Sequence, residues 1–477
     1  MPLQGHIFIG LFLGVVSGPI VDHRAVAQDS QDATGTMLWM SDIHFDPFYG
    51  GDVIKLANES QTGWRDHSEW GSVLKTMAGN TACSPAGKDA NDYLLHMVLD
   101  GAASKLTRKP DLILITGDFL SHHFATDYFS ESRLPGSLTT AELYSQFVNQ
   151  TLAYLALSVS SAFPGVPVVA ALGNNDAYCG DYDVRGNSGF LAATRRTFQK
   201  YFLAGLAEDF QTYGGCYATA IPKTEHKCVV LNSIPFISDY PESYRLNGIP
   251  QLSSFCRPLR TVDLVEEYKW LRGTMERCGE KQKVWLVCHI PPGVACWSGV
   301  QNWPRPISDG NKQIPFVNEF SDFYLGHRDH FAGILTGHSH AAEFKLIRDS
   351  TGSGDPVSFV LMAPSIGRNH HNNTSYRVLS FDRSTLAIKD YTTHWLDGSN
   401  LPTQWGEPFH FTTTYGQADV SPTSLAAVFA GIKSEAKAPT GMTFLDQYFF
   451  DYSTRNGAKN SQPRTHFQKA IGSILGP

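Results

Sequence analysis

The sequence has little charge for its length, and none of that charge is concentrated in one place. Charged residues make up 17% of the 477 residues, against about 25% in typical soluble proteins. The formal net charge is −7, the isoelectric point is near 6.2, and no block of like charges occurs. Because a nucleic-acid-binding protein normally presents a basic face, we expect no nucleic-acid partner.

The chain also lacks any Cys-x-x-Cys pair, which argues against a thiolate zinc site. Its eight cysteines fit an oxidising compartment instead, although eight cysteines permit 105 pairings. Cys216 and Cys228 flank a predicted hairpin, and we expect them to form a disulfide. If the host glycosylates its exported proteins, the Asn-x-Ser/Thr pattern predicts a glycoprotein. The acceptor positions are Asn58, Asn149, Asn372 and Asn373.

Long hydrophobic runs are scarce, and the most prominent one lies at the N-terminus. Ile7–Val21 is uncharged and largely apolar, and Ala25–Ala27 supplies the small residues typical of a cleavage site. The run falls short of the roughly 20 residues that a membrane anchor needs. We therefore expect a signal peptide over residues 1–27 rather than an anchor. The expected location is secreted, periplasmic or a lysosome-like lumen, with no transmembrane segment after cleavage.

Short apolar runs alternate with amphipathic stretches through most of the chain. The runs expected to be buried strands are Met37–Met40, Leu112–Thr116, Val166–Leu172, Val284–Cys288 and Gly333–Thr336. The stretches with helical spacing are Tyr93–Leu106, Ala141–Ser158, Leu191–Phe202, Val262–Cys278 and Pro315–Leu325. Further strands are expected over Cys216–Asn232 and Ala342–Thr393. This pattern predicts an α/β fold with two stacked sheets flanked by helices, a four-layer αββα sandwich.

The end of the chain has a different composition. Asp397–Thr423 is rich in Pro, Gly and Thr, which predicts a linker or an extended wrap. Three short helices are expected after it, at Ser424–Lys437, Thr443–Tyr452 and His466–Leu475. We therefore divide the chain into a catalytic domain over residues 28–400 and a small helical subdomain over residues 401–477. The sequence does not indicate an oligomeric state.

Metal-type side chains follow directly after five of the predicted strands. In chain order the segments are Ser41-Asp42-Ile43-His44-Phe45-Asp46-Pro47, then Thr116-Gly117-Asp118 with His122 beyond it, Leu172-Gly173-Asn174-Asn175-Asp176, Cys288-His289-Ile290-Pro291-Pro292-Gly293, and Thr336-Gly337-His338-Ser339-His340. Residues two apart in an extended chain share a face, so Asp42 with His44, and His338 with His340, point the same way. One such segment alone is a weak signal, whereas five in series are a strong one.

Sites in open α/β sheets gather at the carboxyl ends of strands, so these five segments should converge. Together they offer seven candidate ligands, namely Asp42, His44, Asp118, Asn174, His289, His338 and His340. A nitrogen and oxygen set without thiolate suits zinc, iron or manganese in a catalytic site. Seven ligands, one of them shared, are what two ions roughly 3.5–4 Å apart need.

The chain resembles the calcineurin-like metallophosphoesterase superfamily, whose blocks run D-x-H, G-D, G-N-H-[DE], a lone His and G-H-x-H. Within it, the acid sphingomyelinase-like phosphodiesterase branch is the most similar. The segments that carry this resemblance are Asp42-x-His44-x-Asp46-Pro47, Gly117-Asp118-x-x-x-His122, Leu231-Asn232-Ser233, His289-Ile290-Pro291-Pro292-Gly293, Ala363-Pro364-Ser365-Ile366 and Asn373-Thr374-Ser375-Tyr376-Arg377-Val378. The resemblance covers about residues 36–395. It implies an αββα sandwich with two divalent metal ions, zinc in this branch.

The resemblance also assigns roles. It implies that Asp42, His44, Asp118 and His340 hold one ion, and that Asp118, Asn174, His289 and His338 hold the other. The implied reaction is hydrolysis of a phosphodiester by metal-activated hydroxide, because water between two divalent ions can have a pKa near ~7. His122 matches the histidine that donates a proton to the leaving oxygen, a step worth roughly 10²–10⁴-fold.

The third segment departs from the family pattern. Where the family usually has His, this chain has Asn175. An amide can donate a hydrogen bond to a phosphoryl oxygen but cannot act as an acid, so we expect a phosphate contact only. His123 is an alternative acid, although an exposed spare histidine is the simpler interpretation. Asp176 and Asp181 are either orienting residues or turn residues.

The substrate is less well defined than the site. Sphingomyelinases proper carry an N-terminal lipid-presenting saposin domain, and the short distance from Ala27 to Asp42 predicts none here. We expect a small-molecule or lipid phosphoryl substrate, with nucleotide or phosphoanhydride hydrolysis as an alternative. Aromatic residues near the motifs either stack a base, meet an acyl chain or simply pack: Phe48, Tyr49, Trp64, Tyr178, Trp297 and Trp303.

Two further classes remain open. A phosphomonoesterase of the purple-acid type needs a metal-binding Tyr after the Gly-Asp block, and Phe119–His122 contains none. An inactive binding protein on the same fold is expected to have lost ligands, whereas all seven are present here.

Overall fold

The structure is a computed structural model. It describes residues 33–50, 65–130, 140–183, 188–203, 205–237, 249, 252, 262–309, 312–349, 354–398, 403–434, 436–455 and 464–472. The predicted signal peptide over residues 1–27 and the acceptor Asn58 lie outside these residues. Among the described residues, no helix combines the length and the apolar character that crossing a bilayer requires.

The first sheet has seven strands, in the order β14-β13-β12-β1-β2-β3, with β15 also paired to β13. Its strands are β1 (Thr34–Met40), β2 (Leu112–Thr116), β3 (Val168–Ala171), β12 (Ser375–Asp382), β13 (Ile388–Asp397), β14 (Gln404–Trp405) and β15 (Phe409–His410). β1, β2 and β3 are parallel neighbours, and the remaining pairs are antiparallel. The three parallel strands contain continuous apolar runs, Met37–Met40, Leu112–Ile115 and Val168–Ala171, as expected for strands buried on both faces.

The second sheet has six strands, in the order β10-β11-β9-β6-β5-β4. They are β4 (Tyr217–Ala220), β5 (Lys227–Val230), β6 (Val284–Val287), β9 (Phe331–Thr336), β10 (Glu343–Ile347) and β11 (Ser358–Met362). β5, β6, β9 and β11 run parallel, so their carboxyl ends lie at one edge. A separate hairpin, β7 (Pro306–Asp309) and β8 (Lys312–Pro315), completes the strands of the described residues.

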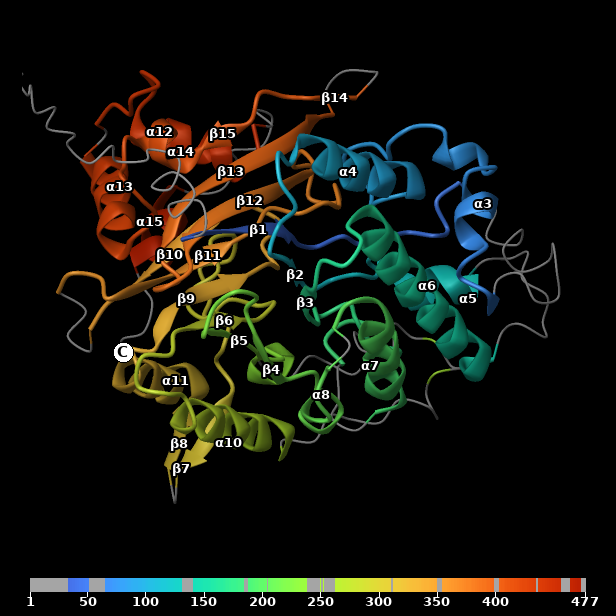
Figure 1. The fold of residues 1–477 in the computed structure, drawn as a ribbon, viewed down its shortest axis with the longest axis horizontal. Coiled ribbons are helices and arrows are strands. Elements are labelled where there is room, and N and C mark those ends of the chain that lie inside the picture. Colours follow the sequence, from blue (N-terminus) through green and yellow to red (C-terminus); the bar gives the residue numbers. More distant parts are fainter. Residues whose placement is uncertain are drawn as a thin grey trace, which may run out of the picture.

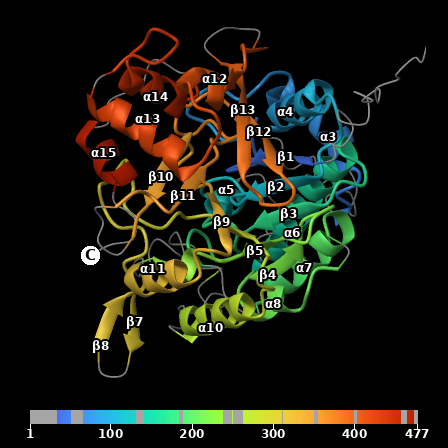
Figure 2. The ribbon, with the colours of Figure 1, turned by 60° about the vertical axis from the view of Figure 1, so that its left-hand side comes forward.

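The two sheets pack face to face (Figures 1 and 2). The ring of Trp285 in β6 lies 4.8 Å from that of Phe381 in β12. The Tyr217 hydroxyl donates to the carbonyl of Ala170, 3.0 Å away in the other sheet. Arg377 is 1% exposed and donates across the interface to the Met362 carbonyl at 2.8 Å. These contacts confirm the predicted stacking of two sheets.

Helices cover the outer sides of this pair of sheets. They are α3 (Trp70–Leu74), α4 (Asp92–Lys105), α5 (Phe124–Ser130), α6 (Ala141–Ala162), α7 (Gly189–Tyr201), α8 (Asp209–Thr212), α10 (Val262–Glu276), α11 (Phe316–Gly326), α12 (Phe411–Tyr415), α13 (Pro422–Ser434), α14 (Phe444–Tyr452) and α15 (Arg464–Gly472). Short 3₁₀ turns occupy Ala78–Asn80 and Ile234–Phe236. The side chains of Asn91 and Thr140 cap α4 and α6 by accepting hydrogen bonds from backbone N–H groups.

The C-terminal helices pack on the sheets rather than standing apart. α13 and α15 contact β10, α12 contacts β13, and all lie on the β10–β13 side in both views (Figures 1 and 2). Of the two alternatives for Asp397–Thr423, a linker or an extended wrap, the described part fits the wrap, because β14 and β15 pair with β13 and α12 follows them. Short elements of two to five residues carry too little periodicity to be recognised in advance.

The predicted Cys216–Cys228 disulfide is also wrong. Both residues carry free thiols. In the β4–β5 hairpin, Cys228 pairs with Thr219, whereas Cys216 precedes the first pair, Tyr217 with Val230. The two cysteines therefore lie at different levels of the ladder and do not face each other. Cys179, after β3, is disulfide-bonded.

Candidate metal centre

The segments after β1, β2, β3, β6 and β9 meet at one end of the two sheets. Backbone hydrogen bonds join them: Asp42 N–H donates to the Gly117 carbonyl, and Gly337 N–H donates to the His289 carbonyl, both at 3.0 Å. The predicted convergence of the five segments therefore occurs, because parallel strands from both sheets end at the same edge.

The backbone is strained where the candidate ligands lie. Asp42, His44, Asp118, His338 and His340 all have positive φ values, between 46° and 74°. Side chains other than glycine rarely adopt this region, and such strain concentrates at functional sites. The surrounding hydrogen bonds hold these residues in place, so that their ligand atoms lie close to one another.

One group of side chains comprises Asp42, His44, Asp118 and His340, whose ligand atoms all lie within 4.8 Å of one another. The Nε2 atoms of His44 and His340 are 3.0 Å apart. Nε2 of His44 is 3.4 Å from Asp118 Oδ2, and Nε2 of His340 is 3.5 Å from Asp42 Oδ1. All four residues are buried.

A second group shares Asp118 with the first. His289 Nε2 lies 3.3 Å from Asp118 Oδ2 and 2.9 Å from Asn174 Oδ1. His338 Nδ1 lies 2.9 Å from the same Asn174 oxygen. All seven candidate ligands are thus brought together, with Asp118 between the two groups.

The donor chemistry suits a divalent cation. Asp42 is 0% exposed and Asp118 is 1% exposed, and within the described part of the chain their ion pairs involve only histidine. Burial raises the pKa of Asp42 to about 7, and burial lowers the pKa of His44 to about 3. Burial acts to lower the pKa of His289, but the charge of Asp118 raises that pKa to about 9. A proton on His289 balances one of the two buried carboxylates, and a divalent metal held by these oxygen and nitrogen atoms would take its place.

Further hydrogen bonds orient the ligand side chains. The Nδ1 atom of His289 lies 2.7 Å from the Thr116 carbonyl, and that of His44 lies 3.0 Å from the Leu120 carbonyl, so their Nε2 atoms face the centre. Asn174 donates its amide N–H to Asp181 at 2.7 Å, which turns Asn174 Oδ1 toward the histidines. Contacts of this kind fix the ligand geometry of metal sites.

Asp176 ties two of the segments together. Its carboxylate accepts hydrogen bonds from the backbone N–H groups of Phe119, Leu120 and Gly173, at 2.8–3.1 Å. It is therefore an orienting residue of the backbone around Asp118 rather than a simple turn residue.

His122 stands at the edge of the first group. Its ring stacks on that of His44, with centroids 3.9 Å apart. The Asp89 carboxylate makes two hydrogen bonds with His122, one with its backbone N–H at 2.7 Å and one with its Nδ1 at 2.9 Å. Burial acts to lower the pKa of His122, but the hydrogen bond to Asp89 and its charge raise that pKa above its usual value.

Asn175 faces Asp118. Its backbone N–H donates to Asp118 Oδ1 at 2.8 Å, and its amide Nδ2 donates to Oδ2 at 2.9 Å. The side chain thus supports the shared carboxylate in this arrangement. His123 is exposed and has a φ of 58°.

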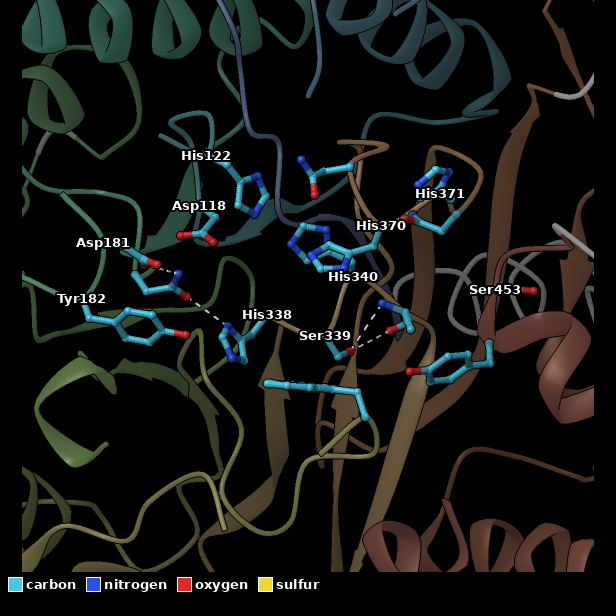
Figure 3. A pocket seen from close by; sticks show the side chains of 16 residues that line it. Asp118, His122, Asp181, Tyr182, His338, Ser339, His340, His370, His371 and Ser453 are labelled. Carbon is cyan, nitrogen blue, oxygen red and sulfur yellow. Dashed lines mark hydrogen bonds between the residues drawn. The ribbon is translucent and has the colours of Figure 1, made fainter. Parts of the chain in front are cut away.

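A cavity of about 470 Å³ opens onto both groups (Figure 3). The cavity is lined by Asp118, His122, Asn174, Asp181, Tyr182, Trp297, His338, Ser339, His340, Ala341, Asn369, His370, His371, Asn372, Tyr452 and Ser453. Trp297 is 56% exposed, whereas Trp303 is fully buried and belongs to the core.

Sequence reasoning missed three features of this site: Asp89, the His370–His371 pair and the end of α14. Asp89 has no local signal, because it lies far from His122 in the chain. The pair stands within a run of Asn and His over residues 369–373, which begins seven residues after β11 ends at Met362, so a search for ligands directly after strands does not find it.

Comparison with known proteins finds related phosphoesterases. Residues 35–342 match the calcineurin-like phosphoesterase family model. Sphingomyelin phosphodiesterase A of Dictyostelium discoideum is 25% identical over 89% of this chain, which spans 63% of that protein's length. Acid sphingomyelinase-like phosphodiesterase 3b of Mus musculus is 22% identical over 84% of this chain and 80% of its own length.

A third relative is named for a nucleotide substrate. Cyclic GMP-AMP phosphodiesterase SMPDL3A of Bos taurus is 24% identical over 82% of this chain and 78% of its own length. The family match covers well over half of the chain and includes every strand that delivers a candidate ligand. The chain belongs to the calcineurin-like phosphoesterase family.

Proposed function

We propose that the chain is an exported dinuclear-metal phosphodiesterase. The observation that carries the proposal is the pair of buried groups that share Asp118, whose Oδ2 lies 3.4 Å from His44 and 3.3 Å from His289. Asp42, His44, Asp118 and His340 would hold one ion, and Asp118, Asn174, His289 and His338 the other. A donor set of imidazole, carboxylate and amide without thiolate favours zinc.

When bound, a pair of divalent cations supplies Lewis-acid chemistry, acidifying water and neutralising charge on phosphoryl oxygens. Proton donation and support of the metal ligands fall to residues of the chain. Asp89 is hydrogen-bonded to Nδ1 of His122, so that Nε2 is available to donate a proton to the leaving oxygen. Asn175 steadies Asp118, and its direct contact with phosphate stays a prediction.

The division into a catalytic domain over residues 28–400 and a helical subdomain over residues 401–477 also belongs to this proposal. Tyr452 and Ser453, at the end of α14, line the cavity, so the subdomain contributes to the substrate site. The apolar N-terminal run and the disulfide at Cys179 support export, because disulfides persist in oxidising compartments.

The substrate we infer is a small-molecule or lipid phosphodiester. The named activities of the relatives include both a sphingomyelin and a cyclic dinucleotide diester. The exposed Trp297 ring on the cavity wall favours a nucleotide as a second candidate, since every nucleobase offers a face for stacking.

The test compares hydrolysis of bis-p-nitrophenyl phosphate with that of p-nitrophenyl phosphate, with and without a chelator. The expected result is faster cleavage of the diester, loss of activity with chelator and recovery on adding zinc. A panel of sphingomyelin and nucleotide diesters then separates the two substrate candidates. Exposed Asp322→Asn serves as a control for Asp118→Asn. Diester hydrolysis that survives complete metal removal would contradict the proposal.

A further inference from the structure

The loop between β11 and β12, residues 363–374, is held rigidly against the site. Arg368 is 3% exposed and donates to the Ser84 carbonyl at 2.8 Å. Asn373 donates to the Thr454 carbonyl at 3.0 Å, and the Thr454 hydroxyl donates back to the Asn373 carbonyl at 2.6 Å. The loop is therefore fixed at one side to the segment before α4 and at the other to the end of α14.

The same segment before α4 also positions His122. Gly87 N–H donates to the Arg368 carbonyl at 2.8 Å, and Arg368 N–H donates to the Lys88 carbonyl at 3.1 Å. Asp89 follows directly and holds His122. The two loops that reach the first ligand group from this side are consequently locked to each other.

This arrangement places His370 on the cavity wall beside His122 (Figure 3). The His370 ring meets that of His340 edge to face, with centroids 4.3 Å apart, and its centroid is 5.9 Å from that of His122. His370 is exposed, whereas His340 beneath it is buried. An exposed histidine thus faces the solvent-filled cavity directly over a candidate ligand.

His370 offers a hydrogen-bond donor in addition to the Asn175 amide. One N–H of the Asn175 amide donates to Asp118 Oδ2 at 2.9 Å, which leaves a single N–H for another acceptor. Neutral imidazole carries one N–H in either tautomer and therefore offers a donor regardless of its protonation. His370 lies close to the first ligand group and is open to the cavity, so it combines a donor with access.

We propose that His370 is a substrate-contacting residue, which donates a hydrogen bond to a phosphoryl oxygen of the diester on the His122 side of the cavity. This inference rests on the proposed function. The loop after β11 thus adds a second donor to the one that Asn175 can supply.

The experiment uses the full, metal-loaded protein with three variants. His370→Phe keeps a ring against His340 without its N–H, His370→Gln keeps a donor without the ring, and exposed His410→Gln is the distant control. For each protein we measure the affinity for inorganic phosphate by calorimetry, kcat and KM for bis-p-nitrophenyl phosphate, metal content and Tm.

For His370→Phe we expect phosphate affinity and kcat/KM to fall about 10- to 100-fold, the range for a hydrogen bond to a charged group. Metal content and Tm should be unchanged, His370→Gln should restore part of the loss, and His410→Gln should match the parent.

Unchanged phosphate affinity in His370→Phe overturns the inference, and so does loss of metal, which would mean that the ring only supports His340. Failure of the parent to cleave the diester would instead refute the proposed function, while phosphate binding would still test His370.

Discussion

The contact between Asp89 and His122 gives the sharpest prediction. Asp89 is 8% exposed and uses both oxygens on His122, at 2.7 Å to the backbone N–H and 2.9 Å to Nδ1. In Asp89→Asn the remaining oxygen serves the backbone, and the amide NH₂ meets Nδ1. Two donors then face each other unless Nδ1 loses its proton. The His122 ring is thereby held neutral, with its proton on Nε2.

The magnitude follows from the hydrogen bond that is lost. A bond to a charged group is worth about 1.5–3 kcal/mol, which corresponds to roughly 10- to 100-fold in rate. This loss is smaller than the roughly 10²–10⁴-fold that general acid catalysis supplies, so Asp89→Asn should remove only part of that contribution. We expect the roughly 10- to 100-fold loss of rate for diesters with alkyl leaving groups, because these leaving groups need a proton. Nitrophenyl leaving groups depart as weakly basic anions, so the loss should be smaller for them.

The assay is kcat/KM for a series of diesters graded by leaving-group pKa, in the parent, Asp89→Asn and His122→Ala. Exposed Asp100→Asn, on α4, controls for loss of an aspartate, and Tm and metal content control for folding. A loss in Asp89→Asn that is equal across the series, with metal retained, would show that Asp89 does not act through proton donation by His122.

Three further predictions concern metal binding by Asp118, the pH dependence of stability from Asp451, and glycosylation of Asn372 and Asn373. Asp118→Asn should lose metal from both groups by mass spectrometry and lose most diester hydrolysis; retention of two ions would refute the sharing of Asp118. Burial raises the pKa of Asp451 from 3.8 to about 6, so the folded state keeps this proton to higher pH and stability falls as pH rises from about 3.8 to about 6. Asp451→Asn should therefore stabilise the protein by up to about 3 kcal/mol at pH 7.5 and little at pH 4, and an equal Tm change at both pH values would contradict this. Asn372 and Asn373 are 6% and 3% exposed with bonded amides, so peptide mapping of protein from a glycosylating host should find no glycan on either.

Much of the fold was predictable because its signals are local. The runs that became β1, β2, β6 and β9 are continuous and apolar, and the helices beside them have clear helical spacing. α3, α5, α8 and the β7–β8 hairpin were missed, since each is too short to establish a period. The Cys216–Cys228 pairing failed because proximity in a hairpin depends on register, which the cysteines alone do not encode.

The sequence by itself determined which chemistry the site could perform. Asp42 with His44, and His338 with His340, stand two apart at strand ends, so that each pair enters the site through local geometry. Asp118, Asn174 and His289 follow from the same rule, because parallel strands carry whatever comes after them to one edge.

Only the tertiary structure decided how these groups are oriented. Asp89 and His122 are 33 residues apart, and their contact depends on how the loop before α4 packs beside β2. The direction of the Asn175 amide depends on the position of Asp118 in the neighbouring segment. His370 reaches the cavity because Arg368 and Asn373 anchor its loop on both sides. Side-chain direction is set by contacts between distant segments, and no local pattern of residues encodes such contacts.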